Sequence, residues 1–166
     1  MAPLKFTLKL LLYACLALPA CAQTNAPQQP AATDLFVGST PSDSLIMALL
    51  QIAPGTPSEF MKWEMRIENR KAATGKFEAT VFYGMTKPNT NGFMGNSAPL
   101  KLTGTFRKQQ GAAGNDKATV YSLQATQFTT PLLLIEMDNN ILHFLTPGKR
   151  LITGNAGWGY VLNKIQ

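Results

Sequence analysis

Apolar and polar side chains alternate one by one along much of the chain. The alternation is clearest over residues 61–68, and residues 77–83 and 100–106 repeat it. A two-residue period is typical of strands with one buried face, because successive side chains on a strand point to opposite faces. In the first stretch, the face predicted to be buried carries Met61, Trp63, Met65 and Ile67. The sequence therefore predicts strands joined in hairpin succession.

The second half of the chain continues this pattern. The further strands are predicted at residues 118–124, 132–137, 141–145 and 158–162. In the last of them, Trp158 and Tyr160 alternate with Gly159 and are predicted to point inward. Residues 108–116 are polar and contain two glycines, which favours a long exposed hairpin loop.

One segment has helical rather than alternating periodicity. Its apolar positions lie at i, i+3, i+4 and i+7, namely Leu45, Ala48, Leu49 and Ile52. Ser42 or Asp43 can cap the start of such a helix, and Pro54 and Gly55 can end it. We predict a short helix within residues 42–52, after a first strand at residues 35–38, with the four apolar side chains toward the core.

These elements predict an all-β fold. About eight short antiparallel strands in sequence order, with one helix after the first, favour an up-and-down barrel over residues 34–166. Closure into a barrel removes the exposed sheet edges that promote aggregation. A β-sandwich built from the same strands is the alternative.

The first 22 residues have the features of a secretory signal: two early lysines, an apolar stretch and small residues at the cleavage region. The apolar stretch is shorter than the roughly 20 residues that a membrane-spanning helix needs. Ordinary cleavage would follow Ala22. The sequence Leu18-Pro19-Ala20-Cys21 instead resembles a bacterial lipoprotein box, in which Cys21 would be acylated, although Pro19 is atypical of that box. Both routes stay open, and both predict an exported protein.

Residues 23–33 are uncharged and contain two prolines, which predicts a disordered tether before the folded domain. The two cysteines of the chain, Cys15 and Cys21, both precede this tether. The folded part therefore has no cysteine with which to form a disulfide, a thiolate metal site or a catalytic thiol.

The composition fits a folded domain of modest charge. Of 166 residues, 45% are hydrophobic and 14% are charged, which excludes a disordered chain. Removing Lys5 and Lys9 with the leader lowers the net charge from +6 to +4, since 13 basic and 9 acidic residues remain. The basic doublets, predicted to be solubilising charge at turns and strand ends, are Arg70-Lys71, Arg107-Lys108 and Lys149-Arg150. With no recognisable nucleic-acid motif, we expect no nucleic-acid partner.

Several short motifs resemble the NlpE-like envelope lipoproteins. They are the lipoprotein-type leader, Phe36-Val37-Gly38 followed by Thr40-Pro41-Ser42-Asp43, and the closing segment Gly157–Leu162. The resemblance covers residues 34–166 and implies a lipocalin-like barrel in the cell envelope, which that family links to copper tolerance or surface-stress signalling. That family carries cysteines soon after the Thr-Pro turn, whereas this chain has Ser42, Ser44 and Ser58 there. A thiol-based copper or redox role therefore does not carry over.

The sequence offers little for catalysis. Its single histidine, His143, lies in a predicted strand and shares a face with Ile141 and Leu145. Glu64 and Glu68 lie on the polar face of another strand, beside basic residues, which indicates solvated surface. We therefore predict a protein that is not an enzyme and has no cofactor.

Two sets of side chains could nevertheless bind something. Thioethers are soft ligands that suit Cu(I), and Met85 and Met94 flank a polar loop, although packing within the loop is the favoured explanation for both. The aromatic residues predicted to point inward could line a ligand pocket or simply fill the core: Trp63, Tyr83, Trp158 and Tyr160. The long loop at residues 87–97 could be a lid, a contact surface or a connector.

Two functions remain as expectations. The first is an exported envelope protein, a lipoprotein if Cys21 is acylated, that is involved in interaction or stress sensing and that a partner protein recognises through exposed loops. We expect it in the periplasm or at the outer membrane, either anchored by a lipid on Cys21 or soluble. The second is a carrier of a small apolar ligand inside the barrel. Copper handling through methionines is a third and weaker hypothesis.

Overall fold

A computed structural model describes residues 32–90, 92–94 and 99–165. Within these residues the chain forms eight strands and one helix. They are β1 (Thr33–Pro41), α1 (Ser44–Leu49), β2 (Phe60–Glu68), β3 (Thr74–Gly84), β4 (Leu100–Ala112), β5 (Asn115–Ala125), β6 (Leu132–Asp138), β7 (Ile141–Leu145) and β8 (Val161–Ile165). The predicted leader and most of the predicted tether, including Cys21, lie outside the described residues.

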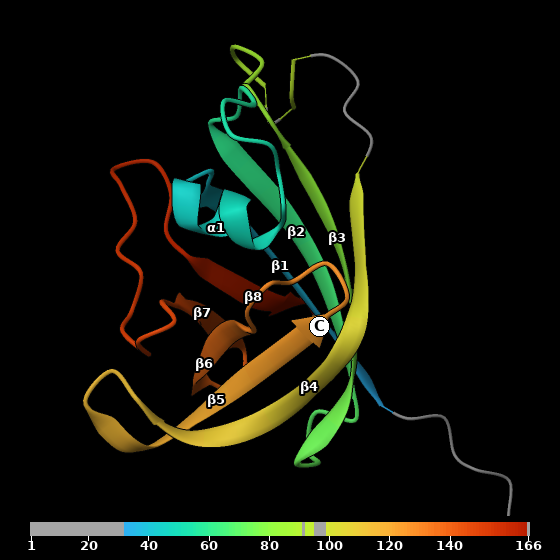
Figure 1. Cartoon of the computed structure of the whole chain (residues 1–166), viewed down its shortest axis with the longest axis vertical. Coiled ribbons are helices and arrows are strands. Elements are labelled where there is room, and N and C mark those ends of the chain that lie inside the picture. Colours follow the sequence, from blue (N-terminus) through green and yellow to red (C-terminus); the bar gives the residue numbers. More distant parts are fainter. Residues whose placement is uncertain (1–31, 91, 95–98, 166) are drawn as a thin grey trace, which may run out of the picture. The chain divides into compact units, whose positions relative to one another are not determined.

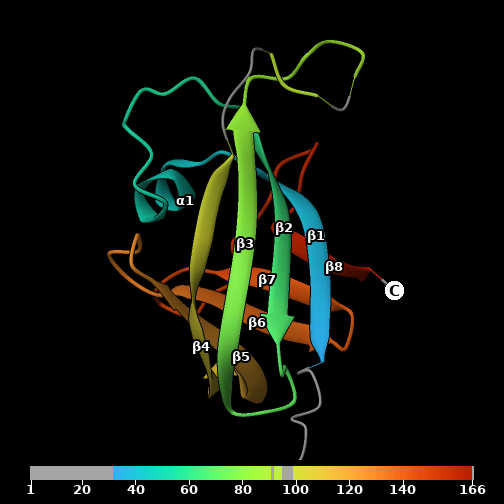
Figure 2. The same ribbon diagram turned by 90° about the vertical axis from the view of Figure 1, so that its right-hand side faces the viewer.

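The eight strands form a closed barrel in which each strand pairs with its neighbours in sequence and β8 pairs back with β1. All of these pairings are antiparallel, and the closing contact joins Leu35 to Ile165, Phe36 to Lys164 and Val37 to Asn163. Figures 1 and 2 show the strands wrapped around one core, with α1 at one end. The predicted up-and-down barrel is confirmed, and the β-sandwich alternative is wrong.

The barrel has two ends with different surroundings. The helix end carries α1 and is marked by the register Pro41–Phe60–Gly84 across β1, β2 and β3. The arginine end, named for Arg70 in the β2–β3 loop, is marked by Thr33 opposite Glu68. Ala32, the first described residue, lies at the arginine end, where its carbonyl accepts a hydrogen bond from the Asn69 amide (2.8 Å).

The alternation read from the sequence corresponds to the inner and outer walls of the barrel. Every predicted inward residue of β2 is buried, with an exposed fraction of 1% or less for Met61, Trp63, Met65 and Ile67.

Two glycines allow strands to approach closely. A Cβ on Gly38 would lie 2.2 Å from the Val161 carbonyl oxygen, and one on Gly104 would lie 2.0 Å from that of Gln124.

The continuous apolar run of β6 is explained by burial on both faces. Leu132 and Leu134 point into the barrel, whereas Leu133 and Ile135 belong to a smaller cluster on the outer wall. The segment after β7 folds back over this wall, since the Ala113 amide donates to the Lys149 carbonyl (2.9 Å). A strand covered on both faces needs no polar alternation.

Two local predictions were wrong. Residues 108–116 are strand rather than loop, because β4 and β5 continue to a two-residue turn at Ala113 and Gly114, both with positive φ (52° and 79°). Such a turn matches the twist of a tight hairpin. The last strand begins at Val161, so Trp158 and Tyr160 precede it.

The buried face of α1 also differs from the prediction. Ile46 and Leu49 are buried, whereas Leu45 is 39% exposed and Ala48 is exposed. The helix has six residues, and the chain leaves helical geometry at Gln51 (φ 55°). The i+7 relation between Leu45 and Ile52 therefore does not hold.

Candidate functional site

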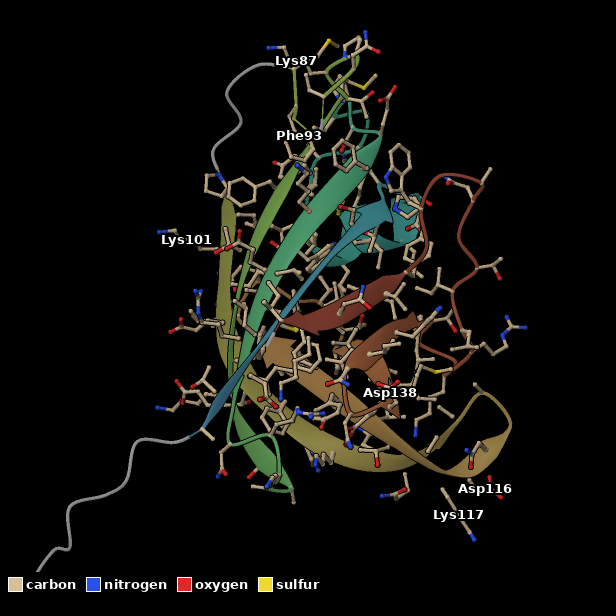
Figure 3. All side chains as sticks on the ribbon, turned by 180° about the vertical axis from the view of Figure 1, so that it is seen from behind. Lys87, Phe93, Lys101, Asp116, Lys117 and Asp138 are labelled. Atoms are coloured by element: carbon tan, nitrogen blue, oxygen red, sulfur yellow. The ribbon has the colours of Figure 1, made fainter. Side chains whose placement is uncertain are left out.

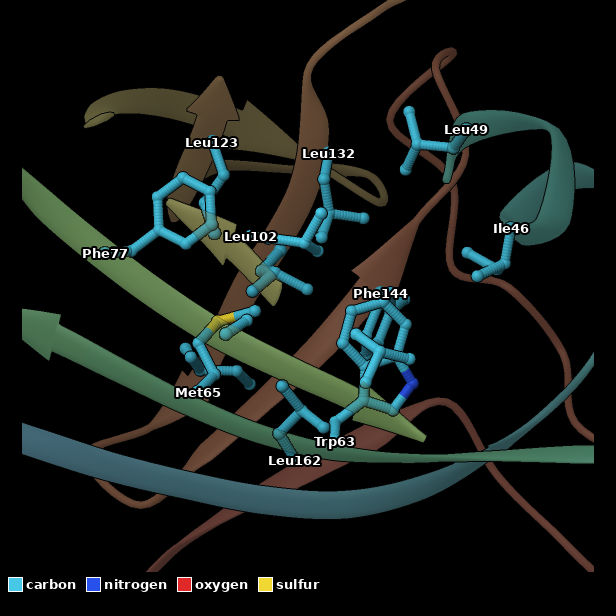
Figure 4. Close-up of a cluster of buried hydrophobic side chains, with 14 of the residues drawn as sticks. Ile46, Leu49, Trp63, Met65, Phe77, Leu102, Leu123, Leu132, Phe144 and Leu162 are labelled. Atoms are coloured by element: carbon cyan, nitrogen blue, oxygen red, sulfur yellow. The ribbon is translucent and has the colours of Figure 1, made fainter. Parts of the chain in front are cut away.

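The interior of the barrel is occupied by packed side chains. Trp63 is 1% exposed, and its ring lies edge-on to Phe144 at 5.0 Å between centroids. Its Nε1 donates to the Oγ1 of Thr40, a fully buried hydroxyl (3.0 Å). Among the described residues, no buried side-chain nitrogen or oxygen lacks a hydrogen-bond partner. Figure 4 shows this packing around Trp63, Phe144 and Leu162.

The four aromatic residues proposed as a pocket do not form one lining. Tyr160 is buried and packs edge-on to Phe144 (6.4 Å), so it shares the core with Trp63. Tyr83 is half-buried and packs against the same core. Trp158 lies elsewhere, in a separate aromatic cluster at the helix end.

Tyr160 links the core to the helix. Its hydroxyl donates to a carboxylate oxygen of Asp43, and the other oxygen of Asp43 caps α1 by accepting from the Ile46 amide (2.8 Å). Burial, together with the hydrogen bond and negative charge of Asp43, raises the pKa of the Tyr160 phenol. The phenol therefore stays protonated and remains a donor at neutral pH.

Three stacked rings form the aromatic rim of the helix end: Phe93, Phe60 and Trp158. The Phe60 ring lies between the other two, 4.5 Å from Phe93 and 5.3 Å from Trp158. The Lys62 ammonium lies 5.6 Å from the centre of the Phe93 ring. Phe93 and Trp158 are both partly exposed. Figure 3 shows Phe93 and Lys87 at this end of the molecule.

A polar cavity of about 410 Å³ adjoins the aromatic rim. Its lining consists of Ser39, Phe60, Lys62, Thr86, Thr90 and Trp158. Glu59 fixes the neighbouring loop by accepting hydrogen bonds from the amide (2.9 Å) and the hydroxyl of Thr86. These hydrogen bonds lower the pKa of the Glu59 carboxyl. The rim thus combines ring faces with hydroxyl groups and one ammonium, which suits recognition of another molecule.

Met85 and Met94 face each other across the base of the same loop. The Met94 amide donates to the Met85 carbonyl (2.9 Å), next to the bridge that joins Thr86 and Phe93. Met94 is 55% exposed. Residues 91 and 95–97 of the predicted lid loop lie outside the described residues.

At the arginine end, Arg70 holds two acidic side chains together. Its Nε lies 2.6 Å from Asp34, its Nη1 lies 2.6 Å from Glu136, and its Nη2 donates to the Asn139 carbonyl (2.9 Å). The side chain of Arg70 is 13% exposed. The expectation that Arg70 is solvated charge at a turn is therefore wrong, because the guanidinium folds inward over the Phe36 ring (5.5 Å).

Lys164 and Tyr121 complete this arginine network. Lys164 Nζ lies 2.8 Å from Asp34, and the Tyr121 hydroxyl donates to Glu136 (3.1 Å). Burial disfavours ionisation of Asp34, but hydrogen bonds from Lys164 and Arg70 outweigh it and hold the pKa of this carboxyl below its ordinary value. Burial and the nearby charge of Glu136 raise the pKa of Tyr121, so it stays protonated.

A cavity of about 440 Å³ opens beside the arginine network. Its charged lining residues are Asp34, Arg70, Lys71, Lys108, Glu136 and Lys164. Two of these, Lys71 and Lys108, have no carboxylate within ion-pair distance in the described part of the chain. Lys108 instead lies 5.3 Å from the centre of the Tyr121 ring. Four basic and two acidic residues leave this cavity with a net charge of +2.

The sequence analysis missed this cluster, although a signal was present. The inward-facing rows of four strands each continue into a charged residue at the arginine end, at Asp34, Lys108, Glu136 and Lys164. Extending the alternation by two residues would have pointed these charges into the barrel mouth. A charge at the end of an inward row requires partners, which the β2–β3 loop supplies through Arg70.

His143, the single histidine of the chain, lies on the outer wall of the barrel, on the face that it shares with Ile141 and Leu145. Its Nδ1 is 2.8 Å from the Phe144 carbonyl oxygen. No three His, Cys, Asp or Glu residues of the described chain are grouped so that they could hold a metal ion. Among the same residues, no helix has the length and apolar character to cross a membrane.

No family model, curated protein or solved structure matches the chain. The resemblance to NlpE-like lipoproteins consequently stays a hypothesis based on short motifs.

Proposed function

We propose that this chain is an exported, non-enzymatic envelope protein that a partner protein recognises at the aromatic rim. The observation that carries the proposal is the filled interior. Bulky side chains such as Trp63, Tyr121 and Phe144 are almost fully buried within the core. The partly exposed rings and hydroxyl groups lie instead on the outside, at the helix end.

The chemistry of the aromatic rim supports a protein partner. Contact sites between proteins are enriched in exposed aromatic residues and methionine, surrounded by polar groups. Trp158 and Phe93 provide the rings, Met94 provides an exposed thioether, and Thr86 and Thr90 provide polar groups. The loop that carries Phe93 is held by Glu59, so part of the surface is ordered before binding.

Photo-crosslinking in cells tests this proposal. A photoreactive residue placed at Trp158 should give one discrete crosslinked protein, and the same residue placed at Glu78, exposed on the outer wall of β3, should not. The product formed from a second rim position, Phe93, should contain the same partner. Equal labelling from the wall and the rim would contradict the proposal.

A carrier of an apolar ligand is the competing function. Native mass spectrometry of gently purified protein distinguishes the two. We expect the mass of the polypeptide without a bound small molecule, because the interior is filled. A stoichiometric lipid-like mass that is lost on enlarging the core side chain Ala79 would favour the carrier instead.

The proposed anchor is tested by the intact mass of the exported protein. An acylated Cys21 would add the mass of its acyl chains, whereas ordinary cleavage would give a chain that begins at Gln23. The proposal places the protein at a membrane of the envelope in the first case and free in the periplasm in the second.

The opposed positions of Met85 and Met94 keep copper handling testable. Two thioethers without a third ligand hold Cu(I) weakly, so we expect no tight one-to-one site. A competition titration that reveals such a site, lost in Met85→Ala or Met94→Ala, would contradict this expectation.

A further inference from the structure

The cavity at the arginine end combines surplus positive charge with a concave lining. Arg70 and Lys164 are balanced by Asp34 and Glu136, with which they form three ion pairs. The remaining charges, on Lys71 and Lys108, are not balanced by any acidic residue of the lining. The whole chain after the leader has a net charge of +4, so half of this excess lines one cavity.

The balanced pairs also make the cavity rigid. Arg70 uses three of its donors on Asp34, Glu136 and the Asn139 carbonyl, which ties the β2–β3 loop to β1 and to the β6–β7 turn. Lys71 follows Arg70 directly, and the Lys108 amide donates to the Ala73 carbonyl of the same loop (2.8 Å). The two uncompensated ammonium groups are therefore carried by backbone that the arginine network fixes.

The cavity lies at the end of the barrel where the chain from Cys21 joins the described domain, at Ala32. Ala32 lines the cavity, and ten residues, hence eleven peptide units, separate it from Cys21 in the chain. Eleven peptide units span at most about 40 Å, whatever their conformation. None of residues 22–33 is charged, so the arginine end is the first charged surface that follows Cys21 along the chain.

We propose that the cavity lined by Lys71 and Lys108 binds the phosphate of an anionic phospholipid headgroup. The inference rests on the proposed lipid anchor, which would keep this end within reach of the bilayer. The volume of about 440 Å³ lies within the range of small-ligand sites, about 300–1,000 Å³. Lysine ammonium groups bind phosphate as point charges, and a basic cluster near an anionic membrane gains affinity from each lysine.

Vesicle flotation tests the inference with exported protein that carries Cys21→Ser, so that no acyl chain contributes. Vesicles that contain phosphatidylglycerol should carry the protein upward at low salt, and pure phosphatidylcholine vesicles should not. Lys71→Gln combined with Lys108→Gln should weaken binding about 30-fold, since each lysine near an anionic surface contributes about fivefold.

The matched control removes the same charge from the helix end. Lys87→Gln combined with Lys101→Gln, two exposed lysines labelled in Figure 3, should change binding less than twofold. Equal losses in the two double variants would overturn the inference, because they would show attraction by net charge alone. Lys71→Gln alone, at an exposed position, should still weaken binding about fivefold, which covers the case of a misfolded double variant.

The source of the phosphate is distinguished by competition. Inorganic phosphate at matched ionic strength should displace the protein from the vesicles no better than chloride does. Displacement at low phosphate concentration would identify a site for a free anion and overturn the lipid assignment. If the Cys21→Ser protein binds no vesicle while the intact mass of the unsubstituted protein shows an acylated Cys21, this inference is overturned and the anchor stays in place.

Discussion

The two ends of the barrel are closed by opposite chemistry. At the helix end, α1 and stacked rings cover the core, and the polar link is the hydrogen bond from Tyr160 to Asp43. At the arginine end, one guanidinium joins two carboxylates beneath a polar cavity. Apolar closure depends on area removed from water, whereas the ionic closure depends on protonation and on every partner being present. The same barrel therefore has one end held mainly by apolar contacts and one end held by ion pairs, whose strength depends on the charge of each partner.

The largest effect is expected at Trp63, the largest fully buried side chain among the described residues. Trp63→Ala should lower the free energy of unfolding by about 4 kcal/mol, because it leaves a cavity beside Phe144 and removes the donor to the buried Thr40 hydroxyl. Denaturant titration measures this loss. Trp158→Ala, at a half-exposed ring, should cost less than half as much. If Trp158→Ala lowers the free energy of unfolding as much as Trp63→Ala does, the aromatic rim contributes to stability as strongly as the buried core.

The ionic closure is tested by Arg70→Ala, which we expect to cost about 3 kcal/mol, since it leaves Asp34 and Glu136 largely buried without their shared partner. Arg66→Ala, an exposed arginine on the outer wall of β2, is the matched control and should be nearly neutral. Similar values for both arginines would show that the arginine network contributes little to stability.

The link between helix and core is tested by Asp43→Ala. The substitution removes the cap of α1 and the acceptor of the buried Tyr160 hydroxyl, so we expect a loss of about 2 kcal/mol. Ser44→Ala, at the next and exposed position, should change stability by less than 0.5 kcal/mol, as is usual for such sites (about ±0.5). If Tyr160→Phe alone reproduces the whole effect, the cap contributes nothing.

The smallest effect distinguishes the ends by pH. Because Asp34 has a lowered pKa in the folded protein, its contribution to stability is present above the ordinary carboxyl pKa and is lost as the pH falls through the folded value. Stability measured below about pH 4 should therefore decline less steeply in Asp34→Asn than in the parent chain. Asp116→Asn, at an exposed hairpin position, should keep the parental slope. If the stability of Asp34→Asn declines with falling pH as steeply as that of the parent chain, the acid-dependent loss does not come from Asp34.

Local patterns predicted the barrel better than they predicted its ends. The alternation in β2 shows which side chains are buried, because one face of this strand points into the barrel and the other points to solvent. The buried face of α1 was missed because six residues are too few for a helical period to decide against tertiary contacts. Trp158 was placed on a strand that begins three residues later, since alternation cannot distinguish a strand from the extended segment before it.

The arginine network was hidden from the sequence for a different reason. Its acidic members lie 36 and 66 positions from Arg70, so only the strand order brings them together. The neighbouring residues Arg70 and Lys71 look alike in the sequence, yet one is largely buried and the other is exposed. The candidate Cys21 lies outside the described residues, and its role stays a prediction.

The pairing of β1 with β8 has a consequence for how the chain reaches its final state. Leu35 and Ile165 are separated by almost the whole domain, so this seam must form after the intervening hairpins, each of which needs only local contacts. Until this pairing forms, β1 and β8 are open edge strands whose backbone groups can pair with another molecule. A delay in docking β8 would therefore favour strand exchange between copies of this chain. A chaperone that covers either edge strand would raise the yield of monomer.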